Sequence, residues 1–107
     1  MDSRTEKIYL GKARHNLKNP INAILGYSEM LIEDCEDLNL DSIIRDLEKI
    51  HESGKNILKI IENNFKDESL NRKDSTINSI AKNTQIHIRI PLNTIIGYSE
   101  IIIEDLN

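Results

Sequence analysis

The 107-residue sequence has no tryptophan, one cysteine, two prolines and four isolated glycines. A single cysteine excludes an internal disulfide and a cysteine zinc site. Glycines that stand alone exclude a glycine-rich phosphate cradle, so this segment has no recognised means of binding ATP. No apolar run approaches the roughly 20 residues that span a bilayer, and the polar start MDSRTEK lacks the apolar core of a secretory signal. We therefore expect a cytoplasmic protein without a membrane span in this segment.

Composition favours an all-α protein that does not bind nucleic acid. The net charge is −4, and the basic residues are dispersed among acids instead of forming the basic face that a phosphate backbone requires. Charged residues make up 30% and aromatics 4%, which is typical of amphipathic helices with a narrow aliphatic core. The spacing of His, Asp and Glu resembles no metal-ligand set, and Cys35 lies on an apolar stripe as a small core residue.

Heptad spacing predicts an antiparallel helical hairpin. Residues 5–37, together with Leu38 directly after them, carry a seam with steps of three and four, namely Leu17, Ile21, Ile24, Ser28, Leu31, Cys35 and Leu38. Residues 42–65 carry a second seam, namely Ile43, Leu47, Ile50, Gly54, Ile57 and Ile61. A short turn lies between them, where Asp41 or Ser42 could cap the second helix. We expect Leu17, Ile21, Ile24, Leu47, Ile50, Ile57 and Ile61 in the core.

One segment of the first helix occurs twice. PINAILGYSEMLIED, residues 20–34, and PLNTIIGYSEIIIED, residues 91–105, are identical at ten of fifteen positions. The sequence therefore predicts a hairpin over 1–66, a polar linker over 67–75 that ends in a cap at Asp74 or Ser75, and a third helix over 76–107 that begins a degenerate second copy. Gly and Ser at matching heights, as in Gly26-Tyr27-Ser28 and Gly97-Tyr98-Ser99, are interpreted as sites of close helix packing.

The stretch HNLKNPINAILGYSEML, which begins at His15, resembles the phosphoacceptor segment of the dimerisation and histidine-phosphotransfer domain of sensor histidine kinases. That family's pattern is His, an acid, any residue, Lys or Arg, Thr or Asn, then Pro. The resemblance implies a homodimeric four-helix bundle and a phosphoryl group that passes from ATP through His15 to the aspartate of a response-regulator receiver. ATP and Mg²⁺ would then require a separate kinase domain in cis or in trans. The residues to which it assigns roles are His15 as acceptor, Lys18 as electrostatic aid, Asn16 and Asn19 as polar neighbours, and Pro20 as a bend.

The physical chemistry of His15 agrees with this resemblance. His15 lies about 200° round the helix from the seam residue Leu17, so it should face solvent, where a donor can reach it. Pro20 removes the N–H that would bond the carbonyl of Asn16, so the helix can bend one turn beyond the histidine. Asn16 departs from the pattern, because an amide cannot act as the base that an acid would provide.

The other histidines fit the motif poorly. In the second copy Ile86 stands at the place of His15, and His87 is displaced by one residue, or about 100° on a helix. His51 has no Lys-x-Pro after it and should lie near Tyr27 and Ser28, away from His15. Two alternatives stay open: a dimerisation scaffold that has abandoned phosphotransfer, and a free phosphotransfer protein that takes its phosphoryl group from a receiver.

Overall fold

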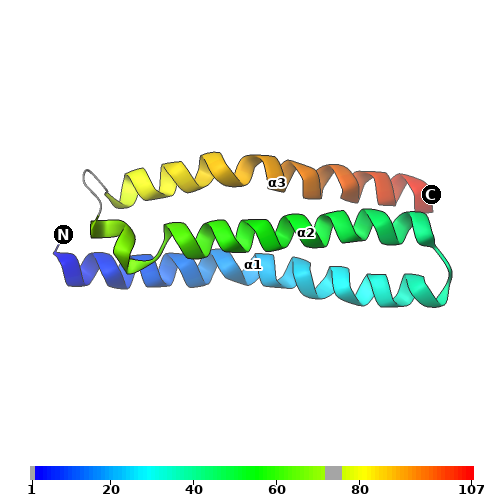
Figure 1. The fold of residues 1–107 in the computed structure, drawn as a ribbon, viewed down its shortest axis with the longest axis horizontal. Coiled ribbons are helices and arrows are strands. Elements are labelled where there is room, and N and C mark those ends of the chain that lie inside the picture. Colours follow the sequence, from blue (N-terminus) through cyan, green and yellow to red (C-terminus); the bar gives the residue numbers. More distant parts are fainter. Residues whose placement is uncertain (1, 72–75) are drawn as a thin grey trace.

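The computed structural model describes residues 2–71 and 76–107, which form three long α-helices and one short 3-10 helix. The elements are α1 (Ser3–Asp37), α2 (Asp41–Asn64), the 3-10 helix η1 (Asp67–Asn71) and α3 (Ile77–Leu106). Consecutive long helices run antiparallel, with α2 between α1 and α3, in a rod of 54 × 20 × 18 Å (Figure 1). The predicted all-α fold is confirmed, and the helix bounds lie within two residues of those expected for the hairpin.

Both ends of α1 are capped by local hydrogen bonds. The backbone N–H of Thr5 donates to Oδ1 of Asp2 at 2.8 Å, and this bond lowers the pKa of the Asp2 carboxyl. At the other end, the N–H of Leu40 donates to the carbonyl of Cys35, and the N–H of Asn39 donates to the carbonyl of Glu36. This is a Schellman motif. Asn39 takes the left-handed conformation there, with φ 58°, which asparagine tolerates better than most residues.

The caps and the linker differ from the prediction. Helix α2 begins at Asp41 after Leu40, and no side chain caps it, so neither Asp41 nor Ser42 has that role. The Schellman turn brings the chain directly into the new helix, which leaves both residues inside it. Helix α3 is capped by Thr76 in a reciprocal pair with Ser79, whereas Asp74 and Ser75 lie outside the described residues. The predicted linker holds η1, where Ser69 is buried and its hydroxyl donates to the carbonyl of Asn63.

The core follows α2, which is packed on two sides. Ile57 and Ile61 are almost inaccessible, and the same cluster contains Ile21, Leu47 and Ile50, as predicted. The remaining buried apolar residues are Leu10, Cys35, Ile43, Phe65, Ile80 and Ile95.

Two of the predicted core residues are less buried than expected. Leu17 is 38% exposed, so its assignment to the core is wrong for the single chain, and Ile24 is only half-buried. Ile24 nevertheless packs against the buried cluster, and a Cβ on Gly54 of α2 would lie 3.8 Å from its Cγ2.

Close helix packing occurs at a different glycine from those predicted. A Cβ on Gly54 of α2 would lie 3.0 Å from Cδ2 of Leu25 in α1, so the small residue lets the two helices approach. A Cβ on Gly26 or Gly97 would meet nothing within 4 Å. The interpretation of these two glycines as packing sites is therefore wrong.

Candidate functional site

His15 lies on the exposed side of α1, as predicted, in a shallow polar depression. Residues three or four positions away from His15 lie beside it on the same face of α1. The residues that line the depression are Gly11, Arg14, His15, Lys18, Asn19 and Asn22. An imidazole here is open to a phosphoryl donor, and three of the five residues assigned by the motif are brought within one and a half turns of the helix.

Two cations beside His15 are attached to the last turns of α2. Nη1 of Arg14 donates to the backbone carbonyl of Phe65 at 2.9 Å, at the C-terminal end of α2 where carbonyls lack helical partners. Nζ of Lys18 lies 3.0 Å from Oε1 of Glu62. The packing of α1 on α2 thus fixes the position of both positive charges relative to the histidine.

Sequence reasoning did not single out Arg14, although its spacing held a signal. Arg14 and Lys18 are four residues apart, which places them on one side of a helix. His15 lies between them in sequence, so the spacing alone predicts two cationic side chains beside the candidate acceptor.

Asn16 lies apart from this depression. It is exposed and lines a second groove, together with Leu17 and Phe65 and with residues at the start of α3. One residue corresponds to about 100° of helix, so Asn16 and His15 belong to different sides of α1. Pro20 is exposed within α1, which continues through it without interruption. Its bend stays a prediction.

The other two histidines have different surroundings. Nε2 of His51 lies 2.8 Å from Oε1 of Glu29, so His51 joins α2 to α1, one residue from its expected height. Nδ1 of His87 lies 2.8 Å from the carbonyl oxygen of Asn83. A carbonyl only accepts, so the neutral His87 ring carries its proton on Nδ1 and donates it.

Over residues 2–71 and 76–107, no three His, Cys, Asp or Glu side chains come together as a metal site would require. Within the same part of the chain, no helix combines the length and the apolar character needed to cross a membrane.

This arrangement defines a helical hairpin that presents a histidine on its first helix. The model of the family "His Kinase A (phospho-acceptor) domain" matches residues 9–71, which is well over half of the chain, and the chain belongs to this family of two-component signalling. The search of curated proteins and the search of solved structures each found no match. The matched residues end before α3, so the family covers the hairpin and η1 only.

Proposed function

We propose that this chain is the phosphoacceptor and dimerisation module of a histidine kinase, and that His15 receives the phosphoryl group. The observation that carries the proposal is the exposed His15 between Arg14 and Lys18, within the residues that match the family. A neutral imidazole nitrogen attacks the γ-phosphorus of ATP held by a separate kinase domain. The N–P bond forms, the bond from phosphorus to the ADP oxygen breaks, ADP leaves and the second ring nitrogen loses its proton.

The two cations favour this step electrostatically. A phosphoryl group brings negative charge to the imidazole, and positive charges within a few ångströms stabilise it. In the second half of the reaction, a receiver aspartate displaces the imidazole from phosphorus, so an aspartyl phosphate forms and the histidine regains a proton. Asn19, on the same depression as His15, can donate a hydrogen bond to the phosphoryl oxygens or to water.

The proposal is tested by labelling in trans. The full chain is incubated with an ATP-binding kinase domain and γ-labelled ATP, and acid-labile label on the chain is measured. We expect label on the wild type and none on His15→Gln. His51→Gln and His87→Gln are matched controls that should keep the label. Label that survives His15→Gln would contradict the proposal.

Asn16 favours a second candidate, a dimerisation scaffold without phosphotransfer. Its amide cannot accept the proton that an acid in this position would take. Incubation with a phosphorylated receiver separates the candidates, because a scaffold gains no label from it and a phosphotransfer protein does. If label comes from the receiver and never from ATP, the chain is a free phosphotransfer protein.

A further inference from the structure

Helix α2 has partners on two sides, and these partners make little contact with each other. It packs against α1 along one side and α3 along the other, whereas α1 and α3 are too far apart for extensive backbone contact (Figure 1). Three helices therefore occupy three corners of a four-helix arrangement. The fourth corner, between α1 and α3, is open.

The two repeated helices face α2 with different sides. In α3 the residues packed against the core include Ile88, Ile95, Tyr98 and Ile102. With the repeats aligned 71 residues apart, their counterparts in α1 are Leu17, Ile24, Tyr27 and Leu31. In α1 three of these four residues are exposed, with Leu17 at 38%, Tyr27 at 67% and Leu31 at 48%, whereas Ile24 is half-buried and packs against the core. Helix α1 thus leaves most of the side by which α3 binds α2 uncovered.

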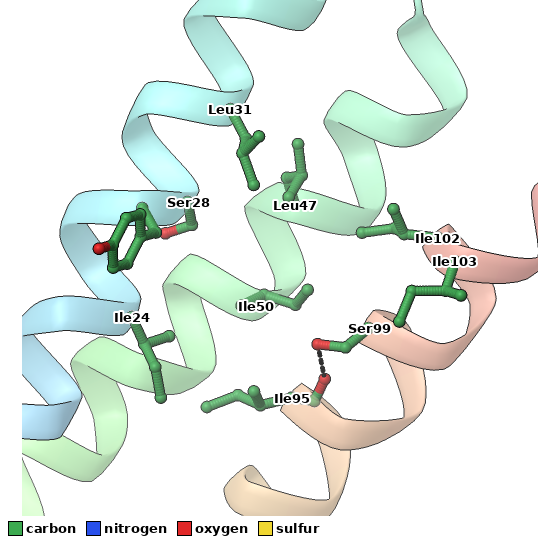
Figure 2. Close-up of a pocket in the computed structure, with 10 residues that line it drawn as sticks. Ile24, Ser28, Leu31, Leu47, Ile50, Ile95, Ser99, Ile102 and Ile103 are labelled. Carbon is green, nitrogen blue, oxygen red and sulfur yellow. Dashed lines mark hydrogen bonds between the residues drawn. The ribbon is translucent and has the colours of Figure 1, made fainter. Parts of the chain in front are cut away.

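The reverse also holds. Helix α1 buries Ile21 and Cys35 against α2, and their counterparts Leu92 and Leu106 in α3 are exposed. An apolar groove lies between α1 and α3, and its floor is formed by Leu47 and Ile50 of α2 (Figure 2). On the α3 side it is lined by residues that also pack α3 on the core, among them Ile95 and Ile102. Besides Leu47 and Ile50, the residues that line this α1–α3 groove are Ile24, Tyr27, Ser28, Leu31, Ile95, Ser99, Ile102 and Ile103.

We propose that α3 is an internal substitute for helix α1 of a second copy of this chain. In the single chain, α3 covers the side of α2 to which the second copy's α1 would bind, so the homodimer forms by displacement of α3. The inference rests on the proposed dimerisation function. It assigns a role to α3, which lies outside the residues matched by the family.

The two arrangements compete with opposite advantages. Helix α3 is attached to its binding site, and a short linker gives an effective concentration of roughly millimolar. The homodimer instead completes a four-helix core and covers the side of α1 that carries Leu17, Tyr27 and Leu31. The interface of α2 with α3 is mostly apolar, whereas the Lys18–Glu62 ion pair and the His51–Glu29 contact both join α1 to α2. Apolar contact is non-directional, so a helix of similar sequence can replace α3.

The first test attaches α3 to α2 covalently in the full chain. Nδ2 of Asn64 donates to Oγ1 of Thr84 at 3.0 Å, so cysteines at these two positions can be joined by a short bis-maleimide. Cys35→Ala removes the native thiol. We expect the linked protein to sediment as a monomer at concentrations where the unlinked protein with the same substitutions dimerises. A linked protein that dimerises as well as the unlinked one would overturn the proposal.

The second test weakens the packing of α3 against α2 and uses no covalent cross-link. Ile95→Asp places a carboxylate on the buried side of α3 and should strengthen dimerisation of the full chain at least about tenfold, because the competitor is released. Ile90→Asp, at a position that is 77% exposed, is the matched control and should leave the dimer dissociation constant unchanged. An unfolded monomer in place of a tighter dimer would show that α3 is a structural part and not a competitor.

Failure of the proposed function is separable from failure of this inference. Dimers that form equally with α3 linked or released overturn the inference alone. Absence of dimers in every variant overturns dimerisation itself, and with it the inference. Absence of label on His15, with the expected order of dimer strengths, overturns the phosphoacceptor role and leaves the inference standing.

Discussion

Lys18 of α1 and Glu62 of α2 form an ion pair one turn of helix from His15, with 3.0 Å between Nζ and Oε1. The lysine belongs to the family motif, and its partner comes from the other helix of the hairpin. The negative charge of Glu62 therefore opposes the two cations beside the proposed acceptor. The pair is partly exposed, so its contribution to stability is small.

Removal of this negative charge should favour phosphorylation. Two unit charges about 8 Å apart in water interact with an energy of about 0.5 kcal/mol, which corresponds to about a twofold change in rate. We expect Glu62→Gln to raise labelling of His15 by about this factor at low salt, and the gain to shrink as salt is added. Glu48→Gln makes the same charge change 14 residues, or about 21 Å, further along α2 and should have no effect. A fall in labelling with Glu62→Gln would contradict this expectation. It would mean that Glu62 helps by orienting Lys18, and that this effect outweighs the repulsion by its own negative charge.

Restoration of an acid next to His15 tests why the motif departs at Asn16. General bases typically contribute about 10²- to 10⁴-fold, so Asn16→Asp or Asn16→Glu should raise labelling of His15 in trans visibly even if the effect is partial. The combination with His15→Gln should carry no label, and His87→Gln should change nothing. If neither acid gives a gain and His15 stays unlabelled, the hairpin is better described as a scaffold.

The glycines should respond oppositely to substitution. Gly26→Ala adds a methyl group in open space on a helix, and should stabilise the chain by about 0.5 to 1 kcal/mol through lower backbone entropy in the unfolded state. Gly54→Val places a branched side chain against Leu25 and should destabilise it by about 1 to 3 kcal/mol. Urea denaturation measures both. Equal effects of the two changes would contradict the close approach at Gly54.

The buried side of α2 should dominate stability. Ile57 is 1% exposed, and Ile57→Ala should reduce the free energy of unfolding by about 2 to 5 kcal/mol. Ile90→Ala removes the same atoms from a surface position and should change it by no more than about 0.5 kcal/mol. Thermal unfolding followed by circular dichroism at fixed protein concentration provides the comparison, because association would otherwise shift the midpoint.

The sequence predicted the elements well because the heptad spacing of Ile and Leu is strong in every helix. It also placed His15 on the surface, since the angle from the seam needs only the helix period. It could not tell that α1 and α3 would use different sides. A repeated sequence predicts the same apolar stripe in both copies, and only packing decides which half of a wide stripe meets α2. For that reason the spacing predicts Leu17 in the core, whereas the structure leaves it 38% exposed.

The motif predicts a site made of residues that are close together in sequence, and the structure divides them between two sides of α1. His15, Lys18 and Asn19 line one depression, whereas Asn16 lines another groove. The local sequence motif could not predict the partners of the two cations either, because Arg14 and its partner Phe65 are 51 residues apart. Such contacts depend on the register of the hairpin, which the Schellman turn at Asn39 helps to fix.

The chain forms three long helices, so it does not end at the height of His15. A domain fused after α3 must therefore reach back along the rod to touch this histidine. After two helices the chain has returned to the height of the histidine, since Arg14 bonds Phe65. Thr84 is near the same height through its bond to Asn64, and 23 further residues (107 − 84) carry the chain about 34 Å along the rod. A kinase domain fused directly after Asn107 would start at the opposite end from the N-terminus (Figure 1). It would need a tether of about ten extended residues to phosphorylate His15 of its own chain while α3 stays seated.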